Sequence, residues 1–211
     1  MDRGLFTRLL FAASSLWLFC TPVLAAASGD AFVDQSFQEF DQKLDTGWRT
    51  LQIKGDYQGA ADAILQYQSV HDAQLQTWQK DSLAFHLGHL YAMTGDKPKA
   101  IEWLQKSLAG SGNPAYIQAY IAFLRGDKAA LVDTRHTLAT TNPGPWRAED
   151  LDEVDAMLAY FDEPFEAAWA ALNCHDPGIK TDTPVWVSYC QAMDVKYRKL
   201  YLQHGIKLQA Q

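Results

Sequence analysis

Residues 87–104 read LGHLYAMTGDKPKAIEWL and decide the fold. Apolar residues recur at helical spacing on both sides of Gly95-Asp96. Glycine can adopt the left-handed conformation that ends a helix, and the aspartate that follows can cap the next helix by accepting hydrogen bonds from free backbone N–H groups. The stretch therefore predicts a helical hairpin, two helices joined by a tight turn at Gly95-Asp96.

The same turn occurs twice more, at Gly55-Asp56 and at Gly126-Asp127. The three glycines are separated by 95 − 55 = 40 and 126 − 95 = 31 residues. Periods of this size are typical of stacked helical hairpins, in which each pair buries its apolar face against its neighbours. The turns thus predict a repeated unit.

Helical spacing continues outside these turns. Apolar residues at positions 37, 40, 44, 48 and 51 predict one amphipathic helix over 37–51, despite Gly47. A fourth hairpin is expected after the loop at 142–145, with its turn at 162–164, and a last helix from 187 to about His204. Strands have almost no support, because no apolar/polar alternation is sustained.

Composition excludes several classes of protein. The 211 residues are 48% hydrophobic, 12% aromatic and 20% charged, which excludes intrinsic disorder and collagen-like or coiled-coil composition. The formal charge of −7 would repel a polyanion, so nucleic acid is not an expected partner. One folded domain, or slightly more, fits this length.

The N-terminus has the layout of a secretory signal peptide. Arg3 and Arg8 precede an apolar run over 9–19, and small residues around Ala25 follow. The run is too short to span a membrane, so we expect removal of residues 1–25 and a soluble periplasmic or secreted protein with no membrane span. An uncleaved anchor is the alternative, and a lipid-modified Cys20 is disfavoured because Phe19 precedes it.

Two cysteines, Cys174 and Cys190, remain after such cleavage. In an oxidising compartment an even pair predicts a disulfide, which could contribute about 3 kcal/mol by restricting the unfolded chain. A redox-active pair is the alternative, but it would need C-x-x-C spacing or a nearby activating base. The bridge would fasten a C-terminal cap to the last hairpin.

The central hairpin resembles the tetratricopeptide repeat. Leu87-Gly88 and Tyr91 match its L-G-x2-Y pattern, and Ala100 with Leu104 matches the following A-x3-F, with leucine in place of the aromatic residue. Ala84 departs from the pattern, because the repeat commonly has tryptophan at this position. The resemblance implies an all-α solenoid of three to four hairpins over residues 30–173, followed by a C-terminal capping helix within 174–211.

In tetratricopeptide repeat proteins, the first helices of successive pairs line a concave groove that binds peptides or partner proteins. Carried onto this chain, the resemblance implies a groove rich in aromatic side chains, which offer a large contact area at a small entropic cost. We call these seven residues the predicted groove: Arg49, Phe85, His89, Met93, Tyr116, Tyr120 and Phe123. The alternative is that the residues at 116, 120 and 123 simply pack between hairpins.

Motifs for catalysis or cofactor binding are absent from the sequence: it has no phosphate-binding loop, dinucleotide turn, zinc-protease pair or nucleophile elbow. His86 and His89 share a helix face but lack the further ligands that structural zinc requires. The acidic residues over 149–166 do not match a calcium loop and are expected to form a solvated helix face. We therefore expect no enzyme activity, no cofactor and no metal.

The expected function is that of a non-catalytic adaptor or scaffold of the bacterial cell envelope, binding a protein or peptide in the predicted groove. A structural subunit of an envelope assembly is one alternative. Another is a helical accessory domain of a cell-wall-acting enzyme, for which the acidic helix near Glu149 would be the candidate region. Filling of the groove by the segment 32–48 would instead suggest a self-occluded, regulated interaction.

Overall fold

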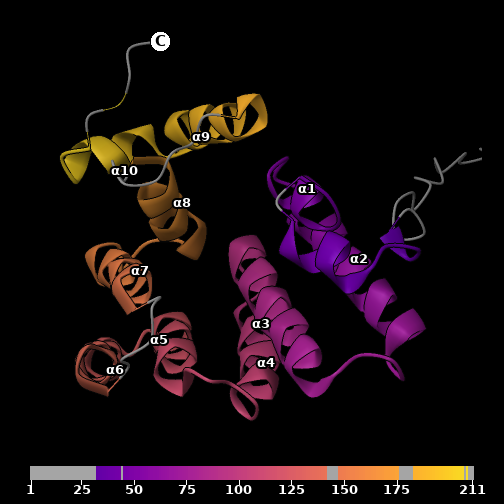
Figure 1. Cartoon of the computed structure of the whole chain (residues 1–211). Coiled ribbons are helices and arrows are strands. Elements are labelled where there is room, and N and C mark those ends of the chain that lie inside the picture. Colours follow the sequence, from indigo (N-terminus) through magenta and orange to yellow (C-terminus); the bar gives the residue numbers. More distant parts are fainter. Residues whose placement is uncertain (1–31, 44, 142–146, 176–182, 207, 209–211) are drawn as a thin grey trace, which may run out of the picture.

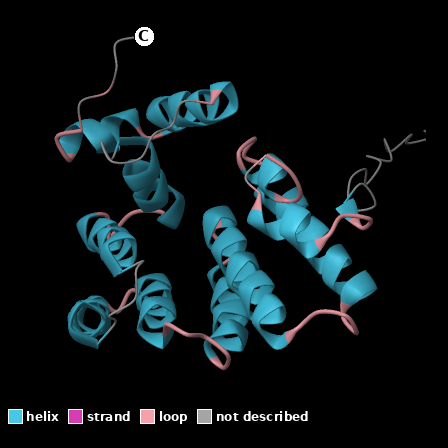
Figure 2. Ribbon diagram, in the orientation of Figure 1, coloured by secondary structure: helices cyan, strands magenta, loops and turns pink. Residues whose placement is uncertain are grey.

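The computed structural model describes residues 32–43, 45–141, 147–175, 183–206 and 208, and within these ranges the chain consists of helices joined by turns and loops (Figures 1 and 2). No strand occurs in these ranges, in agreement with the predicted all-α class. The expected signal peptide at 1–25 lies outside them. The helices are α1 Arg49–Gln52, α2 Tyr57–His71, α3 Thr77–Thr94, α4 Lys97–Leu108, α5 Pro114–Arg125, α6 Lys128–Thr141, α7 Arg147–Ala159, α8 Phe165–His175, α9 Pro184–Lys196 and α10 Arg198–Gln203.

The three Gly-Asp turns are formed as predicted. The glycines have φ of 77°, 81° and 71°, the left-handed conformation that ends a helix. Each following aspartate accepts a hydrogen bond from the backbone N–H three residues on, at 2.9, 3.2 and 2.9 Å. Local turn chemistry is therefore sufficient to place the boundaries between α1 and α2, between α3 and α4, and between α5 and α6.

Helices α3 and α4 approach each other closely at Gly88. A Cβ at this position would lie 2.6 Å from Leu104 Cγ and 3.1 Å from the Leu104 backbone nitrogen. Leu104 is fully buried. The missing side chain thus lets the two helices of the central hairpin pack at short range.

The predicted helix over 37–51 is wrong. A π-helical segment, Gln38–Gln42, ends at Lys43, which is extended, and α1 begins only at Arg49. Between them Gly47 has φ of 57° and packs directly on the carbonyl group of Phe40, where any Cβ would collide with backbone. The chain therefore turns back at Gly47. Phe40 and Trp48 are both buried, but they lie on two separate segments and not on one helix.

The predicted fourth hairpin is present as α7 and α8, but the expected last helix is two helices. Tyr197, with φ of −111° and ψ of 16°, separates α9 from α10. Its hydroxyl donates a 2.6 Å hydrogen bond to Glu166 of α8. The apolar spacing predicted one continuous helix here, but the chain changes direction at Tyr197, where it contacts α8.

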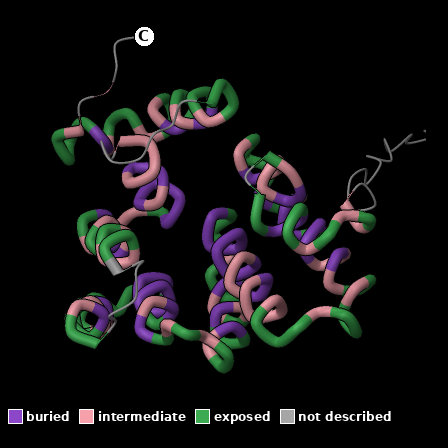
Figure 3. Tube along the Cα trace, viewed as in Figure 1, coloured by how far each residue is buried: buried purple, intermediate pink, exposed green. Residues whose placement is uncertain are grey.

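The helices form a strongly curled chain (Figure 1). Each helix packs mainly on its neighbours in sequence, and α8 additionally contacts α3 while α7 contacts α5. Buried segments concentrate where α3, α5 and α8 face one another (Figure 3). The curl brings α9 back to α2, where the hydroxyls of Tyr57 and Tyr189 lie 3.3 Å apart.

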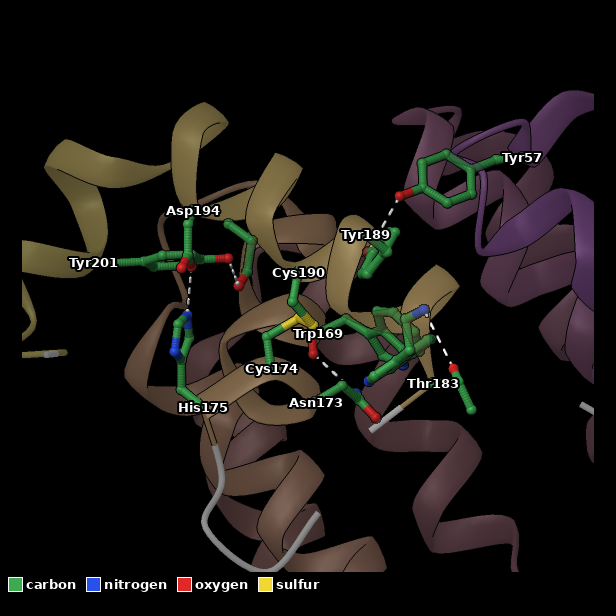
Figure 4. The surroundings of a disulfide bond; sticks show 12 residues. Tyr57, Trp169, Asn173, Cys174, His175, Thr183, Tyr189, Cys190, Asp194 and Tyr201 are labelled. Atoms are coloured by element: carbon green, nitrogen blue, oxygen red, sulfur yellow. Dashed lines mark hydrogen bonds and ion pairs between the residues drawn. A yellow bond between two sulfur atoms is a disulfide. The ribbon is translucent and has the colours of Figure 1, made fainter. Parts of the chain in front are cut away.

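Helices α8 and α9 are joined covalently (Figure 4). The sulfur atoms of Cys174 and Cys190 lie 2.12 Å apart, at bonding distance, as the cysteine count predicted. Next to the bridge, His175 Nε2 of α8 lies 2.9 Å from Asp194 Oδ1 of α9. The last helices are thereby fastened to the fourth hairpin.

Within the described ranges, no helix combines the length and the apolar character needed to cross a membrane.

Candidate functional site

The predicted groove is only partly accessible. His89, Met93, Tyr120 and Phe123 are all buried, whereas Phe85 and Tyr116 are partly exposed. Four of these residues form one aromatic cluster, with ring centroids 5.4 Å apart for Phe85 and Tyr120, 5.8 Å for Phe85 and Tyr116, and 6.1 Å for His89 and Tyr120. The structure therefore brings most of the predicted residues together but leaves only two of them at the surface.

Helix α8 covers the buried part of the predicted groove. The Phe165 ring lies 5.2 Å from His89, 5.3 Å from Tyr120 and 5.8 Å from Phe123, centroid to centroid. Trp169 adds a second ring 5.4 Å from His89. Two aromatic side chains from a helix far along the chain therefore cover part of the predicted groove.

Arg49 lies apart from the cluster, beside Trp48 and Asp41. Its Nε donates a 3.0 Å hydrogen bond to the Asp41 carbonyl oxygen, and its guanidinium carbon lies 4.4 Å from the centroid of the Trp48 ring. These contacts within the chain hold the side chain in place. Arg49, one of the seven residues of the predicted groove, therefore packs on its own N-terminal segment and not beside the other six.

His89 is a neutral core residue. Burial lowers the pKa of its imidazole to about 3, with the charges of His86 and Arg49 adding to the effect. Its Nε2 is buried with no hydrogen-bond partner. Over the part of the chain that is described, no group of three or more histidine, cysteine, aspartate or glutamate side chains is arranged to hold a metal ion.

Acidic residues of α7 pair with neighbouring helices. Glu153 accepts hydrogen bonds from the hydroxyls of Tyr116 and Tyr120, and Asp150 accepts one from Asn113 Nδ2 at 2.7 Å. Burial raises the pKa of Glu153, and the two hydrogen bonds oppose that rise. The expected solvated face is therefore corrected at these two positions, where tyrosines and an asparagine of the preceding hairpin meet the acids.

Asp41, Ser82 and His86 form a second polar group, which the sequence analysis did not find. His86 Nε2 lies 3.3 Å from Asp41 Oδ1 and also 3.3 Å from Ser82 Oγ. A nucleophile relay needs the carboxylate and the serine on different ring nitrogens, so this arrangement does not match one. Ser82 instead donates a hydrogen bond directly to Asp41 Oδ2 at 3.2 Å. Ser82 and His86 thus provide polar partners for the buried Asp41 carboxylate.

The buried Asp41 should make stability depend on acid pH. Burial alone would raise its pKa, but hydrogen bonds from His86 and Trp48 and the positive charges of His86 and Arg49 outweigh burial and lower the pKa to about 2. A folded-state pKa below the unfolded one gives stabilisation that is complete above the unfolded pKa and is lost as the pH falls from about 4 to about 2.

We expect the free energy of unfolding of Asp41→Asn to lie about 2 kcal/mol below that of the native protein at pH 7 and close to it at pH 2. Urea unfolding of both proteins across this range measures the difference. A stability difference between the two proteins that does not change with pH would contradict the lowered pKa of Asp41.

A cavity of about 270 Å³ remains open where α3 meets α5 and the loop before it. We call it the aromatic cavity, and it includes Phe85 and Tyr116 of the predicted groove. Trp78 stands at its edge with 54% of its surface exposed. Its lining residues are Trp78, Asp81, Ser82, Phe85, Ser107, Gly110, Ser111, Gly112, Tyr116 and Ile117.

A larger hollow, about 470 Å³, lies among the end of α3, the turn between α7 and α8, and the junction of α9 and α10. Glu166 at its wall is buried, but its carboxylate accepts hydrogen bonds from the hydroxyls of Tyr57 at 2.7 Å and Tyr197 at 2.6 Å, and from Lys196. Burial raises the pKa of Tyr57, which therefore stays a hydroxyl donor. This carboxylate joins three helices of the chain and is already fully engaged.

Comparisons with protein-family models, with curated proteins and with solved structures found no match to this chain.

Proposed function

We propose that the protein is an exported, periplasmic adaptor of tetratricopeptide-like architecture that binds a protein or peptide segment without catalysing a reaction. The observation that carries the proposal is the aromatic cavity, in which two predicted groove residues, Phe85 and Tyr116, remain accessible next to the exposed Trp78. Aromatic side chains clustered around a depression are the usual anchors of protein recognition.

Helix α8 limits the part of the predicted groove that a partner could reach. Helix α8 fills the inner face with Phe165 and Trp169, so an incoming segment would contact the end of the face formed by the first turns of α3 and α5. A cavity of this volume holds one or two side chains and not a drug-sized molecule. The expected ligand is thus a short segment anchored at one point.

Export is supported by the layout of residues 1–25 and by the cysteine pair at disulfide distance. Disulfides form and persist in oxidising compartments outside the cytoplasm, which agrees with a bridge between α8 and α9.

Selection of a displayed random-peptide library against the purified protein tests the proposal. We expect enriched peptides whose affinity, measured by fluorescence anisotropy, falls at least tenfold in Phe85→Ala, because the replacement removes an aromatic wall of the cavity. The matched control is Val132→Ala, which truncates an apolar side chain 49% exposed on α6 and should leave affinity unchanged. Absence of enrichment, or equal binding by both variants, would contradict the proposal.

A further inference from the structure

The aromatic cavity contains one acidic group, Asp81 of α3. Its Oδ2 is buried and has no hydrogen-bond partner. The carboxylate lies directly over Gly110, where a Cβ would collide with it, so the glycine makes room for the acid. A carboxylate with a buried, unsatisfied oxygen is costly unless a donor or a cation reaches it.

Lys80 and Lys106, which adjoin the cavity residues Asp81 and Ser107 in sequence, are engaged elsewhere. Lys80 Nζ lies 2.8 Å from Asp72 Oδ1, and Lys106 Nζ lies 2.7 Å from Glu102 Oε1 and 3.9 Å from the centroid of the Trp103 ring. Among the described residues, none of the ion pairs includes Asp81. The negative charge of Asp81 is therefore available to a cation from outside the chain.

Three aromatic side chains share the cavity with this acid: Trp78, Phe85 and Tyr116. The faces of aromatic rings attract cations, and tryptophan attracts them most strongly. A carboxylate and ring faces together favour a cation that is planar, weakly hydrated and able to stack. A guanidinium has these properties, whereas a lysine ammonium is compact and strongly hydrated.

We propose that the aromatic cavity receives an arginine side chain of the bound segment, with the guanidinium stacked on the aromatic rings beside the Asp81 carboxylate. This inference rests on the proposed function, since it names the anchor of the segment that the adaptor binds. The volume of about 270 Å³ suits a single side chain. The overall charge of −7 attracts a cationic segment toward the site.

N-acetyl-arginine N-methylamide tests the anchor without any partner, and the matched probe is the citrulline compound, which has nearly the same shape but no charge. The readout is the ¹⁹F resonance of 5-fluorotryptophan at position 78 in the full protein, identified by its loss in Trp78→Phe. We expect a saturable shift with the arginine probe and at least tenfold weaker binding of the citrulline probe. Equal binding of the two probes would overturn the proposal.

Asp81→Asn removes the charge while keeping the side-chain size, and Asp133→Asn on α6 makes the same change of net charge elsewhere. We expect about a tenfold loss of arginine affinity in the first variant and no loss in the second. Equal affinities in both variants would contradict a role for Asp81. If Asp81→Asn failed to fold, the comparison of arginine with citrulline on the native protein would still decide the question.

Two further arms separate this inference from the proposed function. Tetramethylammonium binding as tightly as the arginine probe would show a general site for organic cations and overturn the choice of guanidinium. Peptides that need Phe85 but contain no arginine would leave the adaptor proposal standing and reject the arginine anchor. Arginine binding without any enriched peptide would support the anchor and reject the adaptor.

Discussion

Replacing Trp48 with alanine should lower the free energy of unfolding by about 4 kcal/mol. The side chain is 1% exposed, and its Nε1 donates a 3.1 Å hydrogen bond to the buried Asp41 carboxylate. The variant would lose the packing of the indole against His86, whose ring centroid lies 4.8 Å away, and would remove one donor from the carboxylate. Urea unfolding monitored by circular dichroism measures the change.

Trp48→Phe separates packing from hydrogen bonding, because it keeps an aromatic ring but removes the N–H donor. We expect this variant to lose roughly half as much stability as the alanine variant. Val132→Ala on α6, where the side chain is 49% exposed, is the surface control and should change stability by less than about 0.5 kcal/mol. A loss below about 1 kcal/mol in Trp48→Ala would show that the N-terminal segment does not contribute to the core.

Removing the bridge between α8 and α9 should cost about 3 kcal/mol. The cross-link joins cysteines 16 residues apart, and it restricts the unfolded chain over that loop. The double variant Cys174→Ser with Cys190→Ser should therefore unfold at a lower urea concentration than the oxidised protein. The hydrogen bonds of Glu166 to Tyr57 and Tyr197 do not depend on the bridge, so the variant should still fold.

The reduced native protein is the matched control for this variant. In dithiothreitol, the native chain and the double variant should unfold at nearly the same urea concentration, since neither then has a cross-link. A double variant as stable as the oxidised native protein would contradict the assignment of a stabilising bridge.

The hairpins were predictable because their signals are local. A glycine at positive φ and an aspartate that caps the next helix lie side by side in the sequence, so each Gly-Asp turn could be recognised without tertiary information. The failure at 37–51 has the opposite origin. Apolar spacing there fits a helix. The helix is interrupted, however, where Gly47 packs on the Phe40 carbonyl and Asp41 is buried.

The candidate site was predictable only in part. Positions 85 and 116 follow from the repeat pattern, and both line the aromatic cavity. The covering of His89 and Tyr120 by Phe165 depends on contacts between residues far apart in sequence, which no local spacing indicates. The position of the Asp81 carboxylate was not predictable either, because it depends on the close approach of Gly110 from the next loop.

The meeting of α2 with α8 and α9 has a consequence for how the chain unfolds. In an open array of repeats, each unit touches only its neighbours, so the ends can fray independently. Here the Tyr57 hydroxyl bonds to residues 109 and 132 positions away, which ties α2 to α8 and α9. Such closure couples the two ends into one cooperative unit and raises the contact order, so folding should be slower than in an open array of the same length.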